Sequence, residues 1–479
     1  MTNTWRAGFE TQRAELSDVA LPVEGSFPDW LRGTYLVNGP GEFGVGGRPL
    51  EHWFDPLAML RRFRLVDGAV DYTNRFVRSE DFRVAREAGR VRSPFPGTPA
   101  DRSAPGRLRQ ALTGAYPDNP IIGVVRMDGE YLAVTESPVG LRFDPETLET
   151  TGRRDLTAGL DCDLTLGHAH YDPSDGAGAF WSLGVSYGRE SAYTLFRRPD
   201  GGRPEAKTRL VFDDHPPYVH ALALTGRFAV VPEPPFGVDL RSLLFGAPWG
   251  RTVLDAFAPR DAPARFHVVD RGSGERVAAV AADPFFVYHF ANAHEADGEV
   301  VVDCVAFPDE RAVTGLTLRN LRSDDPDLPR GDLVRYRLPL SGGRADRTTL
   351  REGPVEFPTI GYRRYNGRPY RYAYLVATDR GSLPTAVVKV DVGSGTERAW
   401  REPGSHPGEA VFVPAPDPDA EDDGVLLSVV LDADTDRSEL VCLDAREMEP
   451  LARAALPHRL PFAFHGQFYA DRDPVRSVA

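Results

Sequence analysis

Four histidines, far apart in the sequence, have neighbours that suit a metal site: His168, His220, His289 and His465. Aromatic or aliphatic residues directly precede the last three, which predicts that each of them stands on a buried strand or at a strand end. A buried imidazole needs a polar partner, and one shared metal ion would serve all four. Imidazole binds iron, copper, zinc and nickel alike, so these residues predict a metal site without naming the metal.

The competing interpretation for each histidine taken singly is an ordinary core residue with a hydrogen-bond partner. Two further histidines, His170 and His294, lie within five residues of a candidate ligand. Residue types alone leave both of them open as alternative ligands.

Three glutamates stand among apolar residues, where a solvated charge is not expected: Glu136 in YLAVTES, Glu356 in PVEFPTI and Glu409 in HPGEAVFV. A metal-binding histidine usually donates its second ring N–H to a carboxylate, which fixes the tautomer and the orientation of the ring. Three buried glutamates make a set of the right size for that role. The alternative for each one is an ordinary edge or turn glutamate.

Short strands, rather than long helices, must position these side chains. Apolar runs such as GTYLVNG, RFAVVPE, EVVVDCVAF and GVLLSVVLD are bounded by turn residues, and the 46 glycines and 42 prolines interrupt the chain too often for long helices. Many short strands at this spacing predict an all-β fold, either a propeller or a large barrel. No repeat of fixed period is visible, as expected for a propeller whose blades have diverged.

Two segments interrupt the strand pattern and are expected to cap the scaffold. Residues 83–120 are basic, rich in proline and partly helical in pattern. Residues 232–258 carry large apolar side chains, among them Phe236, Phe245 and Trp249, with few charges.

Composition excludes several classes of function. The net charge of −14 argues against a general nucleic-acid binder. The three cysteines have no CxxC spacing, which favours neither a disulfide framework nor a zinc site and fits a reducing cytoplasm. The N-terminus has no apolar signal core, and no run approaches ~20 apolar residues. We therefore expect a cytoplasmic protein that touches a membrane, if at all, peripherally from its inner face.

Arginine greatly outnumbers lysine, because only Lys207 and Lys389 among the 56 basic residues are lysines. Codon usage in a GC-rich genome would produce this bias. An acidic surface adapted to a salty cytosol would produce it equally well.

The motifs GHAHYDP, YVHALALT, FFVYHFANAHE, GEAVFV and FHGQFY occur in an order that resembles the carotenoid cleavage oxygenase family, which includes a retinoid isomerase and stilbene-cleaving dioxygenases. The resemblance runs almost end to end. It implies a single domain over residues 1–479, folded as a seven-bladed β-propeller with a helical dome built from the two insertions. It also implies Fe(II) held by His168, His220, His289 and His465, with Glu136, Glu356 and Glu409 as hydrogen-bond partners of the ligands.

The function implied by the resemblance is oxidative cleavage of a conjugated double bond in a carotenoid or apocarotenoid. O2 is the co-substrate and the products are aldehydes or ketones, with retinal among the possible products. The apolar substrate would come from a membrane, and the exposed-looking apolar residues of 232–258 would contact that membrane. The residues expected to line an apolar tunnel beside the iron are Phe76, Thr135, Phe285, Phe290, Phe357 and Phe464.

Two other functions compete with carotenoid cleavage. The stilbene-cleaving relatives hold a substrate phenol with a tyrosine and a lysine, and the positions that correspond here are Phe76 and Thr135, neither of which can pair with a phenolate. A carotenoid or retinoid isomerase, or a binding protein, would keep the iron without cleaving. A metal-free propeller hydrolase is disfavoured because the sequence lacks a GxSxG motif.

Overall fold

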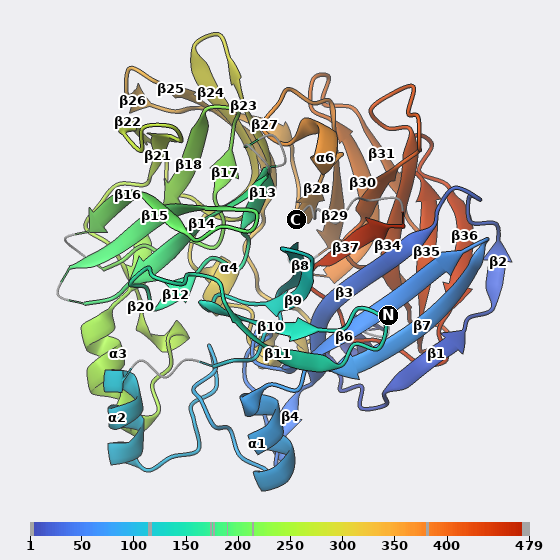
Figure 1. Cartoon of the computed structure of the whole chain (residues 1–479), viewed down its shortest axis with the longest axis horizontal. Coiled ribbons are helices and arrows are strands. Elements are labelled where there is room, and N and C mark those ends of the chain that lie inside the picture. The colour runs from blue at the N-terminus through green and yellow to red at the C-terminus, as the bar shows by residue number, and fades with distance from the viewer. Residues whose placement is uncertain are drawn as a thin grey trace.

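The computed structural model describes residues 4–113, 117–172, 175, 178–188, 190–212, 215–379 and 383–471. Seven β-sheets of four to six strands stand around a common axis, and two further two-stranded sheets lie outside them (Figure 1). The predicted all-β class and the seven-bladed propeller are confirmed.

The first four blades follow the chain in order, and their strands are antiparallel except for the pair β22 and β26. Blade 1 contains β1 (Leu16–Ala20), β3 (Gly33–Glu42), β6 (Leu57–Val66), β7 (Ala69–Phe76) and β37 (Gly466–Ala470). Blade 2 contains β8 (Gly123–Met127), β9 (Glu130–Val134), β10 (Val139–Phe143) and β11 (Thr150–Asp155). Blade 3 contains β12 (Leu164–Thr165), β13 (His170–Asp172), β14 (Ala179–Ser186), β15 (Ser191–Pro199) and β16 (Glu205–Phe212). Blade 4 contains β17 (Ala223–Leu224), β18 (Phe228–Glu233), β21 (Arg265–Asp270), β22 (Arg276–Ala281) and β26 (Gly343–Arg344).

The remaining three blades complete the ring. Blade 5 contains β23 (Phe286–Ala296), β24 (Glu299–Phe307), β25 (Asp332–Pro339) and β27 (Asp346–Arg351). Blade 6 contains β28 (Val355–Thr359), β29 (Tyr372–Asp379), β30 (Leu383–Asp391) and β31 (Glu397–Trp400). Blade 7 contains β2 (Val23–Gly25), β32 (Ser405–Pro407), β33 (Val411–Pro414), β34 (Gly424–Asp432), β35 (Arg437–Asp444) and β36 (Pro450–Ala455).

Both ends of the chain close this ring. The N-terminal strand β2 pairs with β36 in blade 7, and the C-terminal strand β37 pairs with β3 in blade 1. Closure brings the first and last blades together and removes the open ends that an incomplete ring would have.

The hydrophobic core lies between neighbouring blades rather than in one central mass. Side chains of blades 1 and 7 form one cluster, and those of blades 4 and 5 form another. Strands such as β24 and β34 are therefore buried on both faces, which explains their unbroken apolar runs. Three hairpins turn through Asp-Gly pairs with positive φ at both residues, the geometry of a type I′ turn: Asp67–Gly68, Asp128–Gly129 and Asp297–Gly298.

The predicted insertions carry the longer helices. The first contains most of α1 (Glu80–Ala88) and all of α2 (Ala104–Thr113). The second contains the strand β19 (Phe236–Val238), α3 (Leu240–Gly246) and the 3₁₀ helices η2 (Ala247–Trp249) and η3 (Leu254–Ala256), and β20 (Phe257–Pro259) then pairs with β19. α2 packs against α3 and η2, outside the ring of blades (Figure 1).

A buried ionic cluster fixes the end of the second insertion. Arg260, just after β20, lies 2.8 Å from a carboxylate oxygen of Glu233, whose other oxygen is 2.7 Å from Nε2 of His267. Arg260 also donates to the carbonyl oxygen of His215 at 2.6 Å. The insertion is thereby tied to blade 4.

The other elements are short. Three helices and one 3₁₀ helix of at most six residues lie elsewhere, and two short strands pair with each other: α4 (Arg311–Thr314), α5 (Leu318–Leu321), α6 (Tyr362–Tyr365), η1 (Thr4–Phe9), β4 (Gly44–Val45) and β5 (Arg48–Pro49). Within the described part of the chain, every helix is too short or too polar to span a bilayer.

Candidate metal centre

Each of the seven blades supplies one of the seven residues singled out from the sequence. The histidines come from blades 3, 4, 5 and 1, in chain order: His168 between β12 and β13, His220 before β17, His289 on β23 and His465 directly before β37. The glutamates come from blades 2, 6 and 7: Glu136 after β9, Glu356 on β28 and Glu409 between β32 and β33. Residues almost 330 positions apart therefore meet on the axis.

Irregularities in two inner strands help to aim these side chains. The pairing of β23 with β24 shifts register on both sides of Phe290, next to His289. The pairing of β28 with β29 shifts between Glu356 and Thr359, and Phe357 at that point has φ of 54°. Such bulges turn a side chain out of the regular alternation, and they recur beside active sites.

The four imidazoles form one cluster. The ring centroid of His168 lies 4.3 Å from that of His465, 4.8 Å from that of His289 and 5.0 Å from that of His220. Nε2 of His168 is 3.2 Å from Nε2 of His289. Among the described residues, one possible ligand atom from each of His168, His289 and His465 lies within 4.8 Å of the other two.

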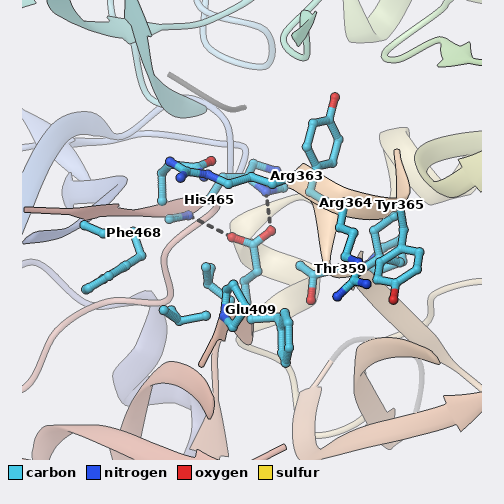
Figure 2. Close-up of a pocket in the computed structure, with 18 of the residues that line it drawn as sticks. Thr359, Arg363, Arg364, Tyr365, Glu409, His465 and Phe468 are labelled. Carbon is cyan, nitrogen blue, oxygen red and sulfur yellow. Dashed lines mark hydrogen bonds and ion pairs between the residues drawn. The ribbon is translucent and has the colours of Figure 1, made fainter. Parts of the chain in front are cut away.

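Three of these rings are held by the three glutamates. Nδ1 of His220 lies 2.6 Å from Glu136, and Nδ1 of His289 lies 2.6 Å from Glu356. Nδ1 of His465 lies 2.9 Å from Glu409 (Figure 2). With Nδ1–H donated to a carboxylate, each ring keeps the Nε2 lone pair free for a metal.

Burial and the neighbouring imidazoles disfavour protonation of His168 and His289. Burial lowers the pKa of His168 and His289 well below the ordinary value, and the neighbouring imidazoles, first among them His465, lower it further. Burial raises the pKa of Glu356 to about 7. Lone pairs of neutral imidazoles that face one another at short range repel unless a cation lies between them, so this donor set fits a divalent first-row metal.

The structure places the two alternative histidines outside the cluster. Nδ1 of His170 lies 3.0 Å from the hydroxyl of Tyr362 on α6. Burial lowers the pKa of His170 to about 4. His294 lies further along β23 and lines a separate cavity with Arg335 and Tyr370.

Two cavities meet at the histidine cluster and share His289, Phe357 and His465. The first, which we call the apolar cavity, has a volume of about 110 Å³ and a largely apolar wall that includes Trp53, Phe54, Tyr288, Leu316 and Phe464. The second, which we call the axial cavity, has a volume of about 780 Å³ and follows the inner strands β8, β28, β33 and β37 to a wall formed by α6. Figure 2 shows Glu409 and His465 in the axial cavity, with Arg364 and Tyr365 of α6 further along its wall.

Known proteins match this chain over nearly its whole length. The family model described as retinal pigment epithelial membrane protein matches residues 9–470. A carotenoid isomerooxygenase of Galleria mellonella is 33% identical over 493 residues, covering 95% of each chain. A β,β-carotene 15,15'-dioxygenase of Mus musculus is 29% identical, covering 97% of this chain and 91% of its own. The chain belongs to the carotenoid cleavage oxygenase family.

Solved structures of this family share the fold. The cobalt-substituted apocarotenoid oxygenase of Synechocystis superposes with a TM-score of 0.86 at 28% identity and covers 98% of both chains. The family resemblance predicted from the motifs is confirmed.

The residues expected to line the substrate tunnel of this oxygenase fall into two groups. Phe290 and Phe357 line the axial cavity, and Phe357 and Phe464 line the apolar cavity. Phe76 packs in the core against Phe82, with a centroid distance of 5.2 Å, and Phe285 stacks on Phe266 at 4.5 Å. Phe76, Phe285 and Thr135 are not among the described residues that line either cavity.

Sequence reasoning missed several residues of the cavity wall. Trp53 and Phe54 pack against Phe464 at 5.0 and 5.5 Å, and Tyr288 stands edge-on to His220 at 5.0 Å. In the sequence, Tyr288 directly precedes His289 and indicates burial of that segment. Its position beside a candidate ligand was the signal that could have found it.

Two buried polar residues hold the Trp53–Phe54 loop. His52 lies with Nε2 2.9 Å from the carbonyl oxygen of Val313. Asp55 accepts hydrogen bonds from backbone N–H groups of His52 and Gly97 at 3.0 and 2.9 Å. Burial raises the pKa of Asp55 to about 6.

Proposed function

We propose that this oxygenase binds Fe(II) through His168, His220, His289 and His465 and uses O2 to cleave a conjugated double bond of a carotenoid or apocarotenoid. The observation that carries the proposal is the cluster of four imidazoles beside an apolar cavity. Relatives named for carotenoid cleavage, aligned over nearly the whole chain, support it.

The chain's own residues would bind, orient and shield. The four Nε2 atoms would hold the iron, and Glu136, Glu356 and Glu409 would keep the three imidazoles in the required tautomer. Bound iron would supply the activation of O2. Because both oxygen atoms end in the two new carbonyl groups, the overall reaction needs no net proton from a protein acid or base.

The apolar cavity suits a polyene. Phe357, Phe464 and Tyr288 present ring faces and edges beside the cluster, and Trp53 and Phe54 extend that wall. A conjugated chain without polar groups loses little on leaving water for such a surface. Aromatic faces can also stabilise cationic character that develops along the polyene.

A membrane source for the substrate is part of the proposal. Four of the exposed large apolar side chains gather on α2, α3 and η2: Leu108, Leu112, Phe245 and Trp249, and we call them the apolar patch. Phe245 is 73% exposed and Trp249 is 84% exposed. Arg241 and Arg251, both exposed, stand in the same insertion. Apolar side chains with basic residues beside them suit shallow insertion among lipid headgroups.

One product assay distinguishes carotenoid cleavage from two alternative functions. A stilbene substrate would need a partner for its phenolate, and Phe76 is buried in the core while Thr135 carries no charge. The other alternative is a carotenoid or retinoid isomerase, or a binding protein, that does not cleave; the printed name of the Galleria mellonella relative, carotenoid isomerooxygenase, includes isomerisation. Isomerisation leaves a product of changed geometry, whereas cleavage alone divides the carbon count between two carbonyl compounds.

The test is to load the protein with Fe(II), incubate it in air with β-carotene, β-apocarotenals and resveratrol, and analyse the products by chromatography with mass detection. Two aldehydes whose carbons sum to those of the polyene are expected. His289→Ala should lose both iron and product, whereas His294→Ala, on the same strand but outside the cluster, should keep both. Wild-type protein that holds iron yet shortens no polyene would overturn the proposal.

A further inference from the structure

Tyr218 contacts both members of the pair formed by the candidate ligand His220 and its carboxylate partner Glu136. Its hydroxyl donates to Oε1 of Glu136 at 2.9 Å, the same oxygen that accepts from Nδ1 of His220 at 2.6 Å. The hydroxyl also lies 3.3 Å from Nδ1 of His220. The phenol, the carboxylate and the imidazole thus form a closed triangle.

The other two glutamates, Glu356 and Glu409, receive their second hydrogen bond from the backbone rather than from a side chain. Glu356 accepts from the backbone N–H of Phe357, and Glu409 accepts from the backbone N–H of Gly466 at 2.7 Å. Among the hydrogen bonds of the described residues, Glu136 receives its second one from a side chain, Tyr218. The orientation of Glu136 therefore depends on one replaceable hydroxyl, whereas the other two carboxylates are fixed by the main chain.

The second insertion holds Tyr218 in place. The backbone N–H of Tyr218 donates to the carbonyl oxygen of Phe236 on β19 at 3.3 Å, and Val238 donates back to Pro216 at 3.2 Å. The Tyr218 ring lies against Phe257 of β20 at 5.2 Å and stacks on Phe286 at 5.7 Å. β19 and β20 are the two strands from which α3 and η2, and with them Phe245 and Trp249, project.

We propose that Tyr218 is a positioning residue, which holds Glu136 so that His220 directs Nε2 toward the metal, and which makes this part of the centre depend on the second insertion. The proposal rests on the metal binding proposed above. It assigns Tyr218 no contact with substrate and no proton transfer.

The test uses cobalt(II) as the probe, added without oxygen to the metal-free full-length protein. Tyr218→Phe keeps the ring and removes only the hydroxyl. It should weaken cobalt affinity about tenfold, the lower end of what loss of a ligand's hydrogen-bond partner costs, and should shift the visible absorption of bound cobalt. The matched control is Tyr370→Phe, which removes a phenol donor 2.8 Å from Asp303, in a cavity away from the cluster, and should leave affinity and spectrum unchanged.

A double-mutant cycle shows whether Tyr218 acts through Glu136. In a Glu136→Gln background, Tyr218→Phe should add little further loss of affinity, because the interaction it removes is already altered. Independent, additive losses would overturn the positioning role. So would a Tyr218→Phe protein with the affinity and spectrum of the wild type.

A gentler variant covers the case in which Tyr218→Phe does not fold. Phe257→Leu keeps the Tyr218 hydroxyl but removes an aromatic contact of the Tyr218 ring. It should shift the cobalt spectrum in the same direction as Tyr218→Phe, by a smaller amount. An unchanged spectrum there contradicts the link to the insertion. If the wild type itself binds no cobalt, the proposed metal site fails; if the wild type binds cobalt and the variants match it, only the role of Tyr218 fails.

Discussion

Trp249 offers the sharpest test of the proposed membrane contact. A tryptophan side chain presents up to ~250 Å², so its exposed fraction of 84% leaves ~200 Å² for contact with lipid. At ~25 cal/mol per Å², burying all of that area would contribute ~5 kcal/mol and burying half of it ~2.5 kcal/mol. We expect burial of about half of the exposed area. Since ~1.4 kcal/mol corresponds to a factor of ten, a loss of ~2.5 kcal/mol means that Trp249→Ala should weaken vesicle binding by roughly 50- to 100-fold.

The assay is co-sedimentation with phosphatidylcholine vesicles that contain no pigment, so that binding is measured apart from turnover. Leu451→Ala is the control, because Leu451 is also exposed but lies on β36 in blade 7, across the molecule from α3 (Figure 1). Equal binding by the wild type and Trp249→Ala would refute the assignment of the patch. A similar loss in Leu451→Ala would mean that adsorption is unspecific.

Three further predictions concern the metal centre, the second insertion and the pH dependence of stability. Glu356→Gln should lower cobalt affinity about 10- to 100-fold in an anaerobic titration, because His289 loses its carboxylate partner; unchanged affinity would contradict this role. Arg260→Ala should destabilise the protein by about 2 kcal/mol in urea denaturation, because Oε1 of the buried Glu233 carboxylate loses its arginine while Oε2 keeps Arg265 and His267; a loss within measurement error would refute the reasoning. Asp55 has a pKa of about 6 in the folded protein against an ordinary value of 3.8, so between pH 4 and 6 the folded state holds more protons than the unfolded state. Stability from this group therefore falls as pH rises through that window, and Asp55→Asn should flatten the fall in Tm; parallel Tm curves would show that burial does not shift this group.

The positions of the candidate ligands were accessible from the sequence because their neighbours are unusual. Apolar residues before His220, His289 and His465 signalled burial, and burial of several polar rings demands a common partner. These signals are local, so one sequence carries them.

The choice between His168 and His170 was not accessible from residue types. In a continuous strand, residues two apart share a face. β12 ends at Thr165 and β13 begins at His170, so His168 lies in an irregular link and the alternation does not apply. A contact almost 200 residues away, with Tyr362, then fixes His170.

For a similar reason, residue types do not distinguish the aromatic residues that line a cavity from those that pack in the core. Phe285 and Phe290 are both aromatic and both flank the His289 motif. Phe285 stacks on Phe266 of the neighbouring blade, whereas a register shift turns Phe290 toward the axial cavity. The two positions differ in their three-dimensional contacts, and the residue types of the segment do not reveal those contacts.

The strands that close the ring also position two residues of the candidate centre. His465 directly precedes β37, the strand that completes blade 1 by pairing with β3. Its partner Glu409 comes from blade 7, which the N-terminal strand β2 completes. Until both termini are in place, the fourth imidazole and its carboxylate have no fixed position, so binding of a metal to all four histidines would favour the closed ring over any open form. The candidate centre, to which each of the seven blades contributes one residue, would thus couple metal binding to the stability of the propeller.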